Sequence, residues 1–64
     1  MKVTYDSDVD CAYVRLAEQD AGGIQTVPVT MGERELNIDL DRDGRLVGLE
    51  LFTASTFLPD NFPR

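Results

Sequence analysis

Apolar and polar residues alternate along most of this chain, which is the pattern of β-strands that bury one face. In the first alternating segment, Val3 and Tyr5 fall on the same side. A second segment covers residues 10–17, and the residues between the two, Asp6–Val9, are rich in turn formers whose side chains can bond their own backbone. We therefore expect residues 1–17 to form a β-hairpin.

The next alternating segment follows a polar loop over residues 18–23 and runs to Met31. It contains Pro28, which has no amide hydrogen and cannot donate to a neighbouring strand. Such a strand lies at a sheet edge or carries a bulge. The pair Gly32-Glu33 predicts a turn into the following strand.

The most regular alternation covers residues 35–40 and 45–51, on either side of an Asp-Gly pair. An Asp-Gly pair between two alternating apolar segments is typical of a hairpin turn. We therefore expect these two segments to form neighbouring antiparallel strands.

The register of this hairpin depends on the length of its loop. A loop of four residues, 41–44, would place Ile38 opposite Val47 and keep apolar residues together. A loop of three residues would place Asp39 opposite Val47 and break the apolar face. We predict the four-residue loop, with Gly44 supplying the positive φ that the turn needs.

The alternation ends after residue 51, and residues 52–58 predict a short helical turn with Thr53 or Ser55 as its cap. Four apolar residues of the tail are suited to covering a sheet face of this chain or of a neighbour: Phe52, Phe57, Leu58 and Phe62. We therefore expect a single all-β domain over residues 1–64, a small antiparallel meander of four to five strands with a short C-terminal helical turn.

A chain of 64 residues has only one small hydrophobic core, and such a core rarely contributes more than about 3–5 kcal/mol. Small domains add disulfides, metals or oligomerisation. The lone cysteine, Cys11, excludes an internal disulfide, and without histidine the usual zinc clusters are excluded as well. Because the few tail residues cannot cover a whole sheet face, we expect a homodimer in which sheet faces or edges meet.

The charge balance narrows the choice of partners. Twelve acidic residues against six basic ones give a net charge of −6. This disfavours nucleic-acid binding, which needs clustered Lys and Arg, and it suits a basic protein partner. The apolar stretches are too short to span a membrane, and no signal peptide is evident. We expect a cytoplasmic protein without a nucleic-acid or membrane partner.

Histidine, the residue most used for acid–base catalysis near pH 7, is absent. We therefore expect no enzymatic activity, no catalytic residue and no cofactor. A small enzyme that uses carboxylates is the least favoured hypothesis, because so short a chain has little room for a ligand pocket.

Four acidic residues satisfy the spacing of an EF-hand calcium loop: Asp39, Asp41, Asp43 and Glu50. Such a loop needs a helix on each side, whereas both flanks here alternate with the period of strands. An extended strand also carries Glu50 about 20 Å from the turn. We expect a plain hairpin, and calcium binding through the Asp39–Glu50 segment is the alternative function.

Further candidates lie near the N-terminus. Asp6, Asp8 and Asp10 are expected in a solvated turn, where they satisfy backbone amides. They are also candidates for contacting a basic partner or weakly binding a divalent cation. Tyr13 and Arg15 share one side of their strand and are further partner-binding candidates.

Packing roles, and no chemical ones, are expected for the two tyrosines and for the thiol of Cys11. Tyr5 and Tyr13, on neighbouring strands, predict a cross-strand packing pair. Cys11 is expected to be a small, half-buried residue, because no neighbouring cation or helix N-terminus is visible that would activate its thiol. Glu50, between two leucines, needs a polar partner if both sheet faces are covered.

Two blocks of the sequence resemble a known family. Residues 1–16 follow the pattern M-K-[IV]-x-Y-D-x-x-x-D-[AV]-[LA]-Y-[IV]-R-L, apart from Cys11, where the family more often has Ala. Residues 38–51 follow [VIL]-D-x-D-x-x-G-x-[IL]-V-G-[IL]-E-[IL], with Ala54-Ser55 after them. Both blocks resemble a family of small prokaryotic proteins catalogued as domain of unknown function 2283.

The resemblance implies a small antiparallel sheet and no established activity. Some members of the family look like partners of small toxin proteins in bacterial two-gene modules. We therefore expect a non-enzymatic protein-interaction module, in an antitoxin-like form one that neutralises a basic partner.

Overall fold

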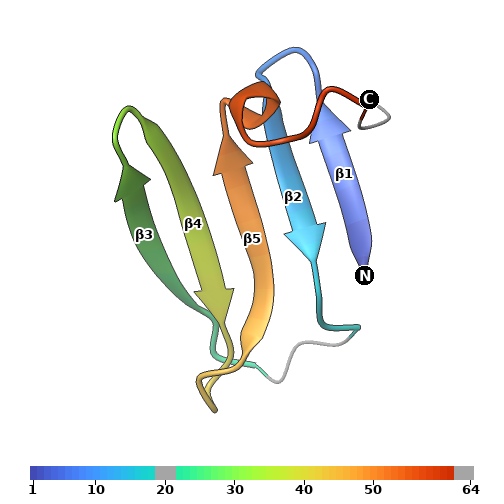
Figure 1. Ribbon diagram of the computed structural model, residues 1–64. Coiled ribbons are helices and arrows are strands. Elements are labelled where there is room, and N and C mark those ends of the chain that lie inside the picture. Colours follow the sequence, from blue (N-terminus) through green and yellow to red (C-terminus); the bar gives the residue numbers. More distant parts are fainter. Residues whose placement is uncertain (19–21, 62–64) are drawn as a thin grey trace.

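A computed structural model describes residues 1–18 and 22–61 as one five-stranded antiparallel sheet with a short 3-10 helix (Figure 1). The elements in chain order are β1 (Lys2–Asp6), β2 (Cys11–Arg15), β3 (Gln25–Met31), β4 (Arg34–Leu40), β5 (Leu46–Phe52) and the helix η1 (Ala54–Thr56). The predicted all-β fold, with its short C-terminal helical turn, is confirmed. No helix of the described residues is long and apolar enough to cross a membrane.

The strands lie in the order β1-β2-β5-β4-β3. β1 and β2 form one hairpin, and β3, β4 and β5 follow one another as neighbours. β5 joins these two parts into one sheet, because it pairs with both β4 and β2. This is the arrangement of a Greek key, read from the C-terminal end. The strand that carries Pro28 lies at the edge of the sheet, as its missing amide hydrogen predicts.

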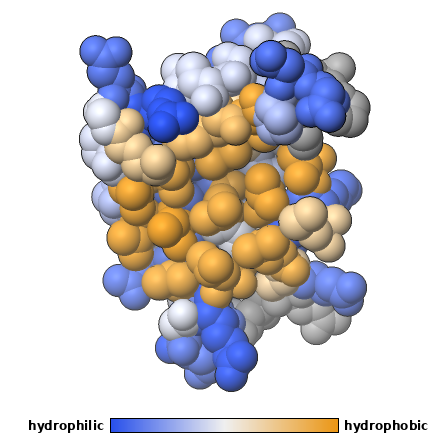
Figure 2. Space-filling view, viewed as in Figure 1, coloured by the Kyte–Doolittle hydropathy of each residue, from blue (hydrophilic) through white to orange (hydrophobic). Residues whose placement is uncertain are grey.

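The two faces of the sheet differ in chemistry because the alternation of each strand is in phase with that of its neighbours. On the apolar face, cross-strand pairs join aliphatic residues through all five strands, for example Val14 with Leu49 and Leu49 with Ile38. Figure 2 shows this face as a continuous hydrophobic surface. On the polar face, the corresponding row joins Tyr13, Glu50 and Asn37.

The loop between β4 and β5 is shorter than predicted. The amide of Asp41 donates to the carbonyl of Arg45 (2.9 Å), and the amide of Gly44 donates to the carbonyl of Asp41 (2.9 Å), so three residues, 42–44, form the loop. Gly44 has φ 80°, as expected. The carboxylate of Asp41 closes the turn by accepting hydrogen bonds from the amides of Asp43 and Arg45.

A β-bulge explains why the predicted register was wrong. The pairing shifts by one residue between Asp39 and Leu40, because Val47 is an extra residue in β5. Ile38 consequently lies opposite Leu49 and not opposite Val47. A regular ladder would have forced a choice between a short loop and an unbroken apolar face, whereas one extra residue allows both.

The core lies at the end of the sheet that η1 covers (Figure 1). Its buried members are Ala12, Leu51 and Ala54, and six partly buried side chains pack against them: Tyr5, Val14, Leu36, Leu49, Phe57 and Leu58. Arg34 fixes the C-terminal segment from β4: its guanidinium lies 4.7 Å from the centroid of the Phe57 ring and donates to the carbonyl of Thr56 (3.2 Å). The described part of the tail, up to residue 61, therefore covers only part of the apolar face. Phe62 lies outside the described residues.

Asp10 supplies the cap that the sequence assigned to Thr53 or Ser55. Its backbone carbonyl accepts from the amide of Ala54 (2.8 Å), and its carboxylate accepts from the amide and hydroxyl of Ser55 (3.0 and 2.7 Å). The same carboxylate accepts from the Tyr5 hydroxyl (2.8 Å). Thr53 does occupy the N-cap position, but its side chain makes no capping hydrogen bond. A residue in the turn between β1 and β2 thus holds η1 in place.

We predict that Asp10→Ala lowers the free energy of unfolding by about 2 kcal/mol. The substitution removes three hydrogen bonds to a carboxylate and places alanine at a backbone φ of 52°. The measurement is urea unfolding at a fixed protein concentration.

The matched control for this prediction is Asp8→Ala. Asp8 is exposed in the same turn, and the hydrogen bond it makes there is from its backbone amide to the carboxylate of Asp6. This variant should stay within about 0.5 kcal/mol of the parent. An equal loss in both variants would contradict a capping role for Asp10.

Candidate functional site

The polar face carries a constellation of side chains from four strands. β2 contributes Tyr13, β5 contributes Gly48 and Glu50, and β4 contributes Asp39, with Thr26 of β3 beside it. These positions are brought together because β5 pairs with both β2 and β4. The constellation therefore depends on the strand order and not on any one hairpin.

A hydrogen bond from Tyr13 to Asp39 spans the central strand. The Tyr13 hydroxyl donates to Oδ2 of Asp39 (2.8 Å), and the Thr26 hydroxyl donates to Oδ1 of the same carboxylate (2.8 Å). β5 lies between β2 and β4, so the tyrosine ring has to cross it. Tyr13 and Asp39 are both half-buried.

The crossing takes place above Gly48. A Cβ atom built on this glycine would lie 2.6 Å from Cζ and 2.8 Å from Cε2 of Tyr13, closer than real Cβ contacts come. Gly48 is buried, although it has no side chain, because the aromatic ring covers its backbone. A glycine inside a strand often marks such a close approach. Only glycine at this position allows Tyr13 to reach Asp39 in this geometry.

Glu50 lies in the adjacent row of the polar face. Its half-buried carboxylate accepts one hydrogen bond, from Nδ2 of Asn37, at 3.5 Å, which is long for such a bond. The polar partner of Glu50 is therefore the side-chain amide of the residue opposite it on β4.

A groove of about 400 Å³ opens on the polar face next to Tyr13 and Glu50. Its described lining comes from β1, the following turn, β2 and β5: Thr4, Tyr5, Asp6, Val9, Cys11, Ala12, Tyr13 and Glu50. This lining contains two acidic residues and two tyrosines, of which Tyr13 lies on the polar face, and it contains neither lysine nor arginine. The groove therefore suits a cationic group better than an anionic one.

The structure divides the five candidate partner-binding residues into two groups. Tyr13 and Arg15 lie on the polar face, and Asp6 reaches the rim of the groove. Asp8 is exposed in the turn, where its amide donates to the Asp6 carboxylate (2.9 Å). Asp10 accepts hydrogen bonds within the fold, from Tyr5 and Ser55.

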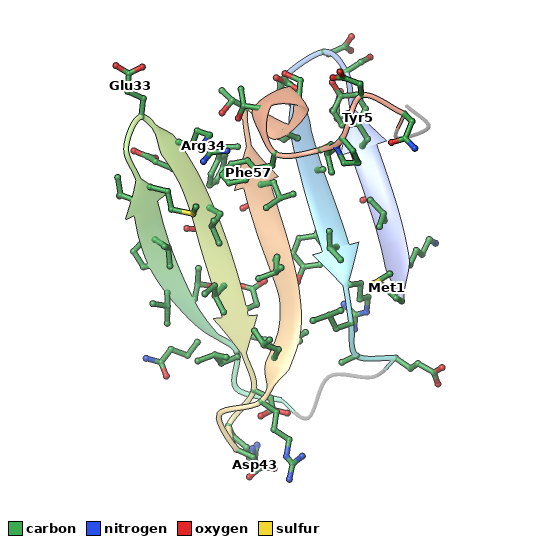
Figure 3. The ribbon with its side chains drawn as sticks, in the orientation of Figure 1. Met1, Tyr5, Glu33, Arg34, Asp43 and Phe57 are labelled. Carbon is green, nitrogen blue, oxygen red and sulfur yellow. The ribbon has the colours of Figure 1, made fainter. Side chains whose placement is uncertain are left out.

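The predicted packing pair of tyrosines was wrong. Tyr5 lies opposite Ala12, whereas Tyr13 lies opposite Thr4, which places the two rings on opposite faces of the sheet. Tyr5 points towards η1 (Figure 3). The error is one residue of register, and such a shift moves every side chain to the other face.

The four residues with EF-hand spacing are not gathered around one point. Asp39 accepts hydrogen bonds from two hydroxyls within the sheet, Asp41 closes the hairpin turn, and Glu50 lies on β5. Asp43 is at the tip of the loop, away from the body of the sheet (Figure 3). In the part of the chain that the structure describes, no group of three or more acidic, cysteine or histidine side chains could hold a metal ion.

Three residues of the polar face were not predicted from the sequence pattern: Gly48, Thr26 and Asn37. Gly48 carried a usable signal, because a glycine inside a regular alternating segment is unusual and points to a close approach of another group. Thr26 and Asn37 carried no such signal, since polar residues at outward strand positions are common. Their roles follow from the pairing of β3, β4 and β5.

Comparison with known proteins identifies one family. Residues 2–55 match the model of a family described as "Protein of unknown function (DUF2283)". The matched span includes both the Asp10 contacts and the polar-face constellation, and it ends before Phe57. No curated protein and no solved structure matches the chain.

We predict that Gly48→Ala lowers the free energy of unfolding by about 1–3 kcal/mol, because the new methyl group collides with the Tyr13 ring. In a Tyr13→Ala background the same substitution should cost nothing or slightly stabilise the strand. A double-mutant cycle in urea measures this coupling. An equal cost in both backgrounds would show that Tyr13 is not the reason for the glycine.

Proposed function

Since the chain belongs to the DUF2283 family, which is described as being of unknown function, we propose from its own geometry that it is a non-enzymatic protein-interaction module that works as a homodimer. The apolar face pairs two copies, and the acidic polar face and turns contact a basic protein partner.

The observation that carries this proposal is the open apolar face. Only four hydrophobic side chains of the described residues are buried: Ala12, Val47, Leu51 and Ala54. None of the larger side chains is fully buried, and β3 and β4 contribute no buried residue at all. Figure 2 shows the result as a wide hydrophobic surface over the strands. A domain normally has two packed layers, whereas residues 1–18 and 22–61 form one sheet with a partial cover.

The dimensions of the face fit an interface between two copies. The backbone spans 33 × 25 × 18 Å. Its broad side therefore has an outline of roughly 800 Å², comparable to the area that each partner buries in a standard protein–protein interface. Two such sheets packed face to face would form a sandwich with an ordinary core about 10 Å thick.

The distribution of charge also favours a second copy. The cross-strand pairs of the apolar face contain no acidic residue, although the chain has a net charge of −6, and their one basic residue, Arg34, packs its guanidinium against Phe57. The acids lie instead on the polar face and in the turns, for example Glu35, Glu33 and Asp43. Two copies can therefore meet without burying like charges, while their outer surfaces stay acidic.

This acidic outer surface supports the second half of the proposal. A net charge of −12 per dimer attracts a basic protein and speeds their encounter. An antitoxin-like role, in which the partner is a small basic toxin, is one form of this proposal. The cytoplasm is the proposed location, since a lone thiol such as that of Cys11 is tolerated there.

We predict that Val29→Lys weakens dimerisation roughly tenfold or more, because Val29 lies on the apolar face of the edge strand β3, where a lysine would place a charge in the interface. Thr30→Lys is the matched control: it lies on the polar face, opposite Glu35. Sedimentation velocity measures the association of both variants. Parent protein that sediments as a single chain at high concentration would contradict the homodimer.

Co-expression tests the antitoxin-like form directly. The chain and the product of the adjacent gene are produced together, with a tag on one of them only. We expect the two to co-purify at low salt and to separate at high salt, because screening weakens an interaction between opposite charges. Failure to co-purify at low salt would count against this form of the proposal and leave the homodimer standing.

A further inference from the structure

The groove on the polar face has the chemistry of a cation site. Its lining joins the carboxylates of Glu50 and Asp6 with the ring of Tyr13 and the hydroxyl of Thr4. Among the described residues, Glu50 accepts one hydrogen bond, a long one from Asn37, which leaves most of its acceptor capacity for a ligand. None of the described residues of the lining carries a positive charge.

The ring of Tyr13 is held in a fixed position. Its hydroxyl is bound by Asp39 on one side of β5, and its ring rests on Gly48. A preorganised aromatic ring next to a carboxylate is the arrangement that favours a planar cation, which can stack on the ring while it bonds the acid. An ammonium group gains less here, because it is a point charge with a tightly held hydration shell.

We propose that this groove binds an arginine side chain of the basic protein partner, with the guanidinium between the Tyr13 ring and the Glu50 carboxylate. This inference rests on the proposed function and assigns its partner-binding surface. Because the groove lies on the polar face, a dimer that forms through the apolar face leaves both of its grooves accessible. Each dimer would then present two arginine sites on opposite outer surfaces.

The test uses the ¹⁵N-labelled full chain and two peptides of equal length, acetyl-Gly-Arg-Gly-amide and its citrulline analogue, which has the same shape without the charge. Amide shifts are followed by NMR at low salt. We expect saturable shifts with the arginine peptide at groove residues, above all Cys11, Tyr13 and Glu50, and no saturable shifts with the citrulline peptide. Binding of one side chain in an open groove should be in the millimolar range.

A matched pair of variants separates the groove from general acidic attraction. Glu50→Gln should weaken binding of the arginine peptide by about fivefold, the effect of losing one charged contact at a partly exposed site. Glu35→Gln removes the same charge from the same face, on β4, outside the groove, and should leave binding unchanged. Glutamine keeps an acceptor for Asn37, so the fold is expected to persist in both variants.

Three outcomes would overturn the assignment. Equal weakening by Glu50→Gln and Glu35→Gln would reveal nonspecific attraction, and so would shifts centred on the exposed acids Glu33 and Asp43. Equal or stronger binding of a lysine peptide would contradict the stacked guanidinium. Sedimentation of the same samples reports the dimer independently, so a groove that fails to bind arginine is distinguishable from a failure of the homodimer.

Discussion

The dominant constraint on this molecule is that a single sheet has two faces, and outside the strands the described residues cover only part of one of them. The five strands align their apolar residues on one face, and the C-terminal segment covers the end of it through Ala54, Phe57 and Leu58. The remaining strands keep their aliphatic side chains partly exposed. Exposed apolar surface of this extent marks an interaction site in soluble proteins. The need to cover it decides the oligomeric state that we propose.

On the opposite face of the sheet, polar groups position one another through hydrogen bonds. Tyr13 crosses β5 because Gly48 leaves room for its ring, and it is held there by the same carboxylate that accepts from Thr26. Gly48 of β5 is thereby tied to an aromatic ring on β2, which is its neighbour in the sheet although β3 and β4 lie between them in the sequence. The same contact fixes one wall of the groove, so packing and recognition depend on one tyrosine.

Local alternation was sufficient to predict the strands, the edge position of Pro28 and the positive φ of Gly44, since each depends on a few neighbouring residues. It was not sufficient for the register of the last hairpin, because the bulge at Val47 is favoured by the match of two strands and not by either strand alone. The pairing of β2 with β5 could not be predicted from local alternation either. The Tyr13–Asp39 contact and the capping role of Asp10 both depend on this pairing, so the candidate site could be predicted only as separate residues.

The position of β5 also has a consequence for how the chain folds. This strand is central in the sheet but last in the sequence, and the caps between Asp10 and η1 join residues 45 positions apart. During synthesis the β1–β2 hairpin therefore emerges without its neighbour, and an isolated hairpin is only marginally stable. The five-stranded sheet can form cooperatively only after the final third of the chain, which contains β5, has left the ribosome. For a protein this small, such distant pairing predicts slow folding and a nascent state with unpaired strand edges.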